Sequence, residues 1–133
     1  MKKTRVLLID DEVMFTRLVR LNLERTGLYE VREENDGSKG YAATRDFKPD
    51  VILLDVMMRE CPGPEVARQI RADRSLDATR IIFVTATPLE PAQTGDILGQ
   101  IPFITKPAPI MQIMRSIDRM CGIEGRTTEG AAA

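Results

Sequence analysis

The chain of 133 residues has no histidine, only two cysteines, no long apolar segment and almost no net charge. Without histidine, imidazole catalysis and histidine-ligated metal sites are excluded. Cys61 and Cys121 lie far apart, outside the spacing of redox or zinc motifs, which predicts two reduced thiols rather than a disulfide or a metal site. The sequence therefore offers no set of soft ligands that would favour zinc.

The charge balance excludes several classes of partner. The 19 basic and 20 acidic residues are interspersed and give a net charge of −1. No field is present that would attract nucleic acid or an anionic membrane. The apolar stretch after Met1–Lys3 is far shorter than the core of a secretory signal, and it ends on two aspartates. We therefore expect a soluble, cytoplasmic protein that binds neither nucleic acid nor membrane directly.

Four short apolar runs each end on polar residues. These are Val6–Ile9 before Asp10 and Asp11, Val51–Leu54 before Asp55, Ile81–Val84 before Thr85, and Phe103–Ile104 before Thr105, Lys106 and Pro107. Such runs are typical of strands buried on both faces of a parallel sheet. Ligands of these sheets bind outside the carboxyl ends of the strands. We therefore expect three carboxylates, a hydroxyl and an ammonium to meet in one crevice.

Helical patterns fall between the predicted strands. The first predicted helix covers about Glu12–Thr26 and is ended by Gly27, and an edge strand is predicted over Tyr29–Glu33. A second helix runs from the cap Asp36 to about Phe47, and a third has Pro64 in its first turn. A poorly supported helix over Pro88–Gly99 and a last helix after Pro109 complete the pattern. The residues predicted to face the core are Phe15, Leu18, Val19 and Leu23 in the first helix, Val66, Ala67 and Ile70 in the third, and Ile110, Ile113, Met114, Ile117 and Cys121 in the last.

This pattern predicts one α/β domain with five strands alternating with five helices. The expected fold is a doubly wound, three-layer sandwich around a five-stranded parallel sheet in the flavodoxin-like order 2-1-3-4-5. We expect the domain to cover residues 1–121. Residues 122–133 have no period and are predicted to form a flexible tail. Ile123–Arg126 resembles the recognition site of a tag-removing protease, so one interpretation is that part of this tail does not belong to the natural protein.

The expected crevice predicts both a metal and a reaction. Asp10, Asp11 and Asp55 would repel one another unless a positive charge lay between them. Carboxylate oxygens suit Mg²⁺, which binds few protein ligands together with water and phosphate oxygens. A carboxylate is also a nucleophile toward phosphorus, and the resulting phosphoryl group needs a cation and a hydroxyl donor. Lys106 and Thr85 supply these two groups.

From Lys3 to Cys121, the chain resembles the receiver (response-regulator) domain of bacterial two-component signalling. The features that match are Asp10-Asp11 after the first strand, Asp55 with Gly63 eight residues later, Thr85 after the fourth strand, and Lys106-Pro107 after the fifth. The resemblance implies that Asp55 is the phosphoacceptor. It also implies that Asp11 and Asp55 bind Mg²⁺ together with the backbone carbonyl of Met57, and that Asp10 assists through water.

The resemblance assigns further roles on the other side of the crevice. Thr85 and Lys106 are implied to hold the phosphoryl group, and the Lys106–Pro107 peptide bond is implied to be cis. Phe103 stands where the family has its switch aromatic, and simple core packing of this ring is the alternative. Met57 and Met58 are interpreted as gap-filling side chains.

The chain also departs from the family pattern. Arg59 stands where the family commonly has proline, Pro62 stands where it has an aspartate before the glycine, and Ala108-Pro109 follows Lys106-Pro107 in place of an aromatic residue or leucine. Met57 and Thr87 occupy the positions that flank the phosphoryl group in the family. Neither offers a good base for the attacking water, which predicts slow self-dephosphorylation.

The expected function is a phosphoacceptor module that takes a phosphoryl group on Asp55 from a histidine kinase with Mg²⁺. Phosphorylation would then change the face formed by the fourth helix, the fifth strand and the last helix. This face would control a downstream partner, and a homodimer is open to form through it. It is not expected to be an enzyme beyond its own phosphorylation and dephosphorylation. Two alternatives remain, a receiver-like binding module that is never phosphorylated and an aspartate-nucleophile phosphatase. The phosphatase requires Asp-x-Asp after the first strand, and Asp10-Asp11-Glu12 does not fit.

Overall fold

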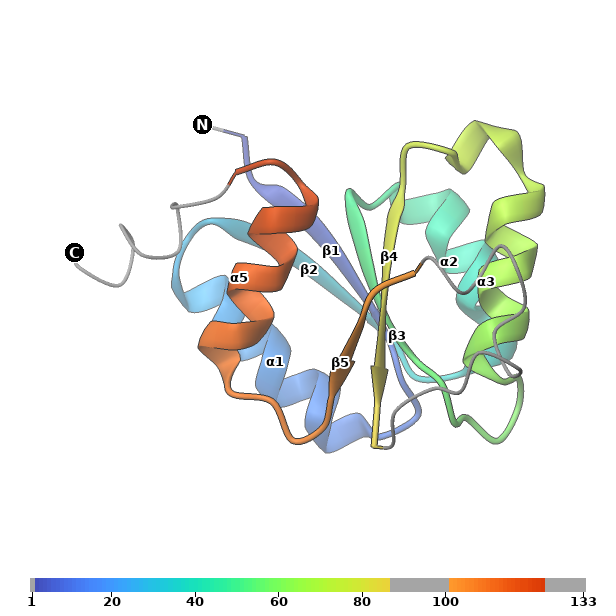
Figure 1. Cartoon of the computed structure of the whole chain (residues 1–133), viewed down its shortest axis with the longest axis horizontal. Helices are drawn as coiled ribbons and strands as arrows, with labels where there is room; N and C mark the ends of the chain where they lie inside the picture. The colour runs from blue at the N-terminus through green and yellow to red at the C-terminus, as the bar shows by residue number, and fades with distance from the viewer. Residues whose placement is uncertain (1, 87–100, 124–133) are drawn as a thin grey trace.

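The computed structural model describes residues 2–86 and 101–123. In this part of the chain, five parallel strands form one sheet in the order β2-β1-β3-β4-β5 (Figure 1). The strands are β1 (Thr4–Ile9), β2 (Tyr29–Glu34), β3 (Val51–Asp55), β4 (Arg80–Thr85) and β5 (Phe103–Thr105). The helices are α1 (Val13–Arg25), α2 (Gly40–Phe47), α3 (Gly63–Ala72) and α5 (Ile110–Met120). The predicted fold class and strand order are therefore confirmed.

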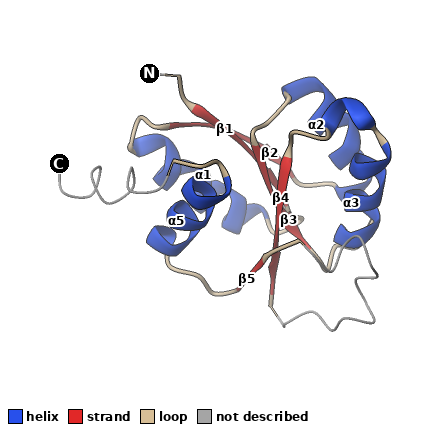
Figure 2. Cartoon of the chain, turned by 45° about the horizontal axis from the view of Figure 1, so that its top comes forward, coloured by secondary structure: helices blue, strands red, loops and turns tan. Residues whose placement is uncertain are grey.

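Helices cover both faces of the sheet and make three layers. α1 and α5 lie on one face, and α2 and α3 lie on the other (Figures 1 and 2). Alternate side chains of each central strand enter opposite cores, as period-two geometry requires. In β1, for example, Leu7 and Ile9 pack with the α2 and α3 side, while Val6 and Leu8 pack with the α1 and α5 side. Burial on both faces explains why these strands read as continuous apolar runs.

Most of the predicted helix faces are confirmed. Val66, Ala67 and Ile70 of α3 are fully buried, and so are Ile113 and Ile117 of α5. Asp36 accepts a hydrogen bond from the backbone N–H of Ser38 at 2.9 Å, and a 3₁₀ turn over Gly37–Lys39 leads into α2. Gly27 adopts a φ of 76° just beyond α1, as its predicted capping role requires. The helix predicted over Pro88–Gly99 lies outside the described residues.

The inward face of α1 differs from the prediction at one position. Leu18 was expected in the core, but it is 62% exposed, whereas Thr16 is completely buried together with Val19 and Leu23. The buried positions 16, 19 and 23 follow helical spacing, so the buried face of α1 is rotated about the helix axis relative to the face that hydrophobicity predicts. Thr16 is tolerated there because its hydroxyl hydrogen-bonds to the Glu33 carboxylate at 2.7 Å.

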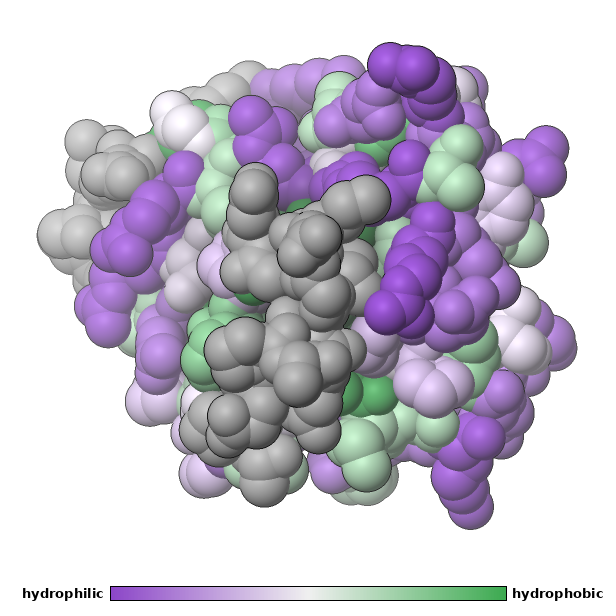
Figure 3. Space-filling view, turned by 45° about the vertical axis from the view of Figure 1, so that its right-hand side comes forward, coloured by the Kyte–Doolittle hydropathy of each residue, from purple (hydrophilic) through white to green (hydrophobic). Residues whose placement is uncertain are grey.

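The surface carries mostly polar side chains on the side that Figure 3 displays. Hydrophilic residues dominate the area around α3, and hydrophobic ones are scattered among them. Among the described residues, none of the helices has the length and apolar character needed to span a bilayer. The two cysteines form no disulfide, as expected.

One glycine controls how closely α3 approaches the end of β3. A Cβ atom at Gly63 would lie 2.2 Å from the carbonyl oxygen of Asp55 and 2.9 Å from Cα of Val56. The Gly63 N–H also donates to the Val56 carbonyl at 2.9 Å. Backbone atoms cannot yield as a flexible side chain would, so position 63 admits only glycine without displacement of the strand that carries Asp55.

Gly63→Ala is therefore expected to lower the free energy of unfolding by about 2 kcal/mol or more, because it forces two backbone segments apart. Gly27→Ala is the matched control, since no atom lies within 4 Å of its added Cβ and only the positive φ opposes it. That control should lose about 1 kcal/mol. Urea unfolding of both variants measures the difference. Equal losses would contradict the steric explanation.

Candidate phosphoacceptor and metal site

Strand register brings the predicted site residues together. Ile9 of β1 pairs with Leu54 of β3, so Asp10 and Asp55, the residues that follow them, lie side by side at the carboxyl edge of the sheet. On the other side of β3, Thr85 pairs with Thr105 at the ends of β4 and β5, and Lys106 comes next. The parallel arrangement alone thus gathers four strand ends at one edge.

Three carboxylates form the centre of this edge. One oxygen from each of Asp10, Asp11 and Asp55 can be chosen so that all three atoms lie within 4.8 Å of one another. Asp10 is 2% exposed and Asp55 is 7% exposed, whereas Asp11 is partly exposed at the rim. Such a cluster in a partly buried crevice carries strong like-charge repulsion.

Lys106 supplies the positive charge nearest to the cluster. Its ammonium lies 2.7 Å from Oδ2 of Asp10 and 4.3 Å from the ring centre of Phe15. Only 16% of the Lys106 side chain is exposed, so this ion pair is shielded from water. The backbone N–H of Lys106 donates to the Thr85 carbonyl at 2.7 Å, and the Lys106–Pro107 peptide bond is cis, as the resemblance implied.

The protein itself already binds both carboxylate oxygens of Asp10. Oδ1 accepts a hydrogen bond from the backbone N–H of Glu12 at 2.9 Å, while Oδ2 faces Lys106. Asp55 makes only a long contact of this kind, 3.4 Å from the backbone N–H of Met57 to its Oδ1. Asp55 is therefore less constrained than Asp10, and its pKa differs from that of an ordinary aspartate.

Burial, and after it the negative charge of Asp10, raise the pKa of Asp55 to about 6, while the charge of Lys106 and the Met57 N–H act in the opposite direction. The ionised carboxylate is thus present at neutral pH but is held at a free-energy cost. A carboxylate that is ionised at such a cost becomes more stable when a cation or a covalent bond reduces its negative charge.

The remaining predicted residues lie near the cluster with different exposures. Thr85 is 1% exposed at the end of β4. Met58 is buried, but Met57 is 74% exposed, so the gap-filling interpretation is correct for Met58 and wrong for Met57. Phe103 is 46% exposed on β5, which excludes the alternative that it is simply a core residue. Thr87 lies outside the described residues.

Arg59, which departs from the family pattern, lies beside Asp11. Its backbone N–H donates to Oδ2 of Asp11 at 3.2 Å, and its Nε lies 3.7 Å from the same oxygen. The Arg59 side chain is 84% exposed, so the ion pair is worth little in water. The backbone contact nevertheless joins the loop after β3 to the loop after β1.

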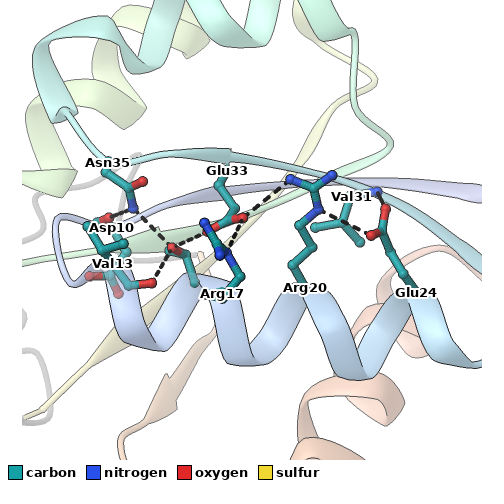
Figure 4. Close-up of polar contacts among 9 residues, drawn as sticks. Asp10, Val13, Arg17, Arg20, Glu24, Val31, Glu33 and Asn35 are labelled. Atoms are coloured by element: carbon teal, nitrogen blue, oxygen red, sulfur yellow. Dashed lines mark hydrogen bonds and ion pairs between the residues drawn. The ribbon is translucent and has the colours of Figure 1, made fainter.

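Three polar residues near the site were not found from the sequence. Asn35 donates its side-chain amide to the backbone carbonyl of Asp10 at 2.8 Å and to the hydroxyl of Thr16 at 3.0 Å. Thr16 in turn contacts Glu33 (Figure 4). The sequence signal for Glu33 and Asn35 was their position at the carboxyl end of the edge strand β2, which lies beside β1, the strand that Asp10 follows.

The sequence of residues 6–118 matches the family model of the response regulator receiver domain. The chain belongs to this family. It is 39% identical over 106 residues to the transcriptional regulatory protein ResD of Bacillus subtilis, a match that covers 79% of the chain and 42% of ResD. The chain spans about half the length of the transcriptional regulators that it matches.

Solved structures of receiver domains show the same fold. The chemotaxis protein CheY4 of Vibrio cholerae is 28% identical, with a TM-score of 0.80, over 90% of this chain and 99% of CheY4. The receiver domain of the sensor histidine kinase PA1611 from Pseudomonas aeruginosa is 23% identical, with a TM-score of 0.79, over 91% of this chain and 99% of that chain. In the PA1611 structure, a magnesium ion is coordinated in the active site cleft.

Receiver domains bind Mg²⁺ at an acidic pocket, and the aspartate cluster of this receiver domain has the donors for it. All three side chains are hard oxygen ligands, as Mg²⁺ prefers. Glu12 and Lys106 engage the two oxygens of Asp10, and the backbone N–H of Arg59 engages one oxygen of Asp11. Burial and the charge of Asp10 raise the pKa of Asp55, so a nearby positive charge stabilises its ionised carboxylate.

Asp55→Asn is expected to raise the free energy of unfolding by on the order of 1 kcal/mol at about pH 7 in metal-free buffer. The pKa of Asp55 is higher in the folded state, so the folded protein binds this proton more tightly than the unfolded chain. The resulting stability is present below the ordinary pKa of 3.8 and is lost as the pH rises through about 6. Asparagine cannot ionise and avoids that loss.

The measurement is chemical unfolding of wild type and variant at about pH 4 and about pH 7 with a chelator present. The gain from Asp55→Asn should be larger at the higher pH. Asp46→Asn, on the exposed surface of α2, is the control and should show no such difference. A gain that is the same at both pH values would contradict the burial argument.

Proposed function

We propose that this receiver domain accepts a phosphoryl group on Asp55 from a phosphohistidine of a partner histidine kinase. The convergence of Asp55, two further aspartates and Lys106 at one strand edge is the observation that carries the proposal. These 133 residues contain no histidine, so the donor imidazole lies outside them. A small acyl phosphate would provide the same phosphoryl group.

The reaction is one phosphoryl transfer. A carboxylate oxygen of Asp55 attacks phosphorus, a P–O bond forms as the P–N bond to the donor breaks, and the electron pair of that bond returns to the imidazole. The Thr85 hydroxyl and the Lys106 ammonium bind the phosphoryl oxygens. Thr85 ends β4 and Lys106 follows β5, so both groups stand at the same edge of the sheet as Asp55 before the charge moves.

Asp11 and Asp55 would hold Mg²⁺ directly with the backbone carbonyl of Met57, and Asp10 would assist through water. When bound, the ion neutralises the charge of the carboxylates and phosphoryl oxygens that must approach one another. Asp10 has a second task that needs no metal, since it holds the Lys106 ammonium in the crevice at 2.7 Å.

The output is proposed to be a population shift. A phosphoryl group on Asp55 competes with Asp10 for Lys106, and the arrangement that binds it better becomes more populated. Thr85 and Phe103 are the proposed switch residues, and the responsive face includes β5, α5 and the predicted helix over Pro88–Gly99. That face would contact a homodimer partner, an output domain or a separate effector, within the cytoplasm.

Asp55→Asn should abolish the mass gain of one phosphate after incubation with Mg²⁺ and acetyl phosphate, because an amide does not attack phosphorus. Intact-mass spectrometry measures it. Asp46→Asn should label like the wild type. Persistent labelling of Asp55→Asn would exclude Asp55 as acceptor. A wild type that takes up no phosphate would favour a binding module, and rapid turnover of acetyl phosphate would favour a phosphatase.

Met57→Asn should shorten the lifetime of the phosphoryl group by several-fold, because a polar side chain at this exposed position can orient the attacking water. Phosphate loss is followed over time after removal of the donor. Met57→Leu keeps the apolar character and serves as the control. If all three proteins lose phosphate at one rate, access through the Arg59 loop rather than the Met57 side chain sets the lifetime.

A further inference from the structure

We propose that Asn35, Thr16 and Glu33 form a positioning relay that fixes the peptide between Asp10 and Asp11 and so orients Asp11 toward Mg²⁺. The inference rests on the proposed function, because it concerns the metal site of the phosphoacceptor. The structure places no relay residue in the aspartate cluster. They are positioning residues that act through the backbone of the β1–α1 loop.

The relay begins at the Asp10 carbonyl. Asn35 donates one N–H to this carbonyl at 2.8 Å and the other to Oγ1 of Thr16 at 3.0 Å. A carbonyl oxygen can only accept, so the amide nitrogen of Asn35 must face it. The Thr16 hydroxyl has two acceptors within reach, Oε1 of Glu33 at 2.7 Å and the Val13 carbonyl at 3.1 Å, and the shorter contact to Glu33 continues the relay (Figure 4). The direction of the Asn35 amide is therefore defined, and the Thr16 oxygen accepts from it.

Glu33 anchors the far end. Its side chain is only 9% exposed, and its Oε2 lies 3.3 Å from Arg20 and 3.5 Å from Arg17. Arg20 also contacts Oε1 of Glu24 at 3.1 Å, and Oε2 of Glu24 accepts from the backbone N–H of Val31 at 3.4 Å. The network in Figure 4 thus joins α1 to β2 at Glu33 and again at Val31. The loop that bears the aspartates is tied to this rigid pair.

The hydrogen bond to the Asp10 carbonyl restrains the peptide that leads into Asp11. That carbonyl and the Asp11 nitrogen belong to one planar peptide, which rotates as a unit. The N–H of Asp10 is held separately, by the Glu34 carbonyl at 3.1 Å. With both sides of Asp10 held, the backbone enters Asp11 in one direction, and the Arg59 N–H holds Oδ2 of Asp11 at 3.2 Å. Without Asn35, the peptide can rotate, and metal binding must then also order the loop.

Four variants and Asp11→Ala test the relay. Thr16→Val removes the hydroxyl and keeps the shape, whereas Thr16→Ser keeps the hydroxyl. Asn35→Ala removes the amide, and Asn22→Ala removes an amide on α1 that donates to the Leu18 carbonyl at 2.8 Å. Each protein is titrated with Mg²⁺ alone in a calorimeter, melted without metal, and phosphorylated by acetyl phosphate over a range of Mg²⁺ concentrations.

Thr16→Val and Asn35→Ala should raise the Kd for Mg²⁺ about tenfold, the usual effect of losing a residue that supports a metal ligand. Thr16→Ser and Asn22→Ala should keep the wild-type Kd. Phosphorylation of the relay variants should need more Mg²⁺ but reach the wild-type maximal rate, because Asp55, Thr85 and Lys106 are intact. This separates a positioning role from a catalytic one.

A wild-type Kd in both Thr16→Val and Asn35→Ala would overturn the relay, even if their metal-free melting temperatures fell, since a merely structural role affects both forms equally. If Thr16→Val fails to fold, the comparison of Asn35→Ala with Asn22→Ala decides. Loss of binding in Asp11→Ala alone would leave the proposed function standing while the relay fails. A wild type that binds no Mg²⁺ would refute both.

Discussion

Like-charge repulsion among Asp10, Asp11 and Asp55 is the interaction on which the rest of the site depends. Two unit charges about 4 Å apart interact by about 4 kcal/mol at the effective dielectric constant of a protein surface. That is several times the net value of an exposed ion pair, at most about 1 kcal/mol. The shielded Lys106–Asp10 pair offsets part of this repulsion, while burial, and after it the charge of Asp10, raise the pKa of Asp55. A divalent cation and a phosphoryl acceptor reaction both relieve what is left.

The register of the strands brings the three carboxylates together, and the rigidity of the sheet keeps them there in spite of their repulsion. Parallel pairing puts the residues after Ile9 and Leu54 at the same level, and the burial of both strands on two faces prevents them from moving apart. The absence of a side chain at Gly63 lets α3 approach the Asp55 backbone closely. On the opposite side, the Glu33 network joins α1 to β2 and supports the loop of Asp10 and Asp11.

Much of this arrangement follows from the sequence, because apolar runs of strand length fix the sheet and the residues after them fix the site. What hydrophobicity could not predict was side-chain direction near polar neighbours. Leu18 is exposed and Thr16 buried because a hydroxyl with a carboxylate partner can be buried at little cost. Met57 is exposed where packing was expected, and it lies in the loop that joins β3 to α3. Asn35 acts across sequence-distant loops, which no local pattern reveals.

The identity of the phosphorylated residue is the central claim. The most direct measurement is borohydride reduction of the protein after incubation with Mg²⁺ and acetyl phosphate, followed by peptide mass spectrometry. Reduction converts an acyl phosphate into an alcohol and so marks an aspartyl phosphate as homoserine. The account predicts homoserine at position 55 and nowhere else. Homoserine at Asp10, at Asp11 or at a surface aspartate, or no homoserine at all, would contradict it.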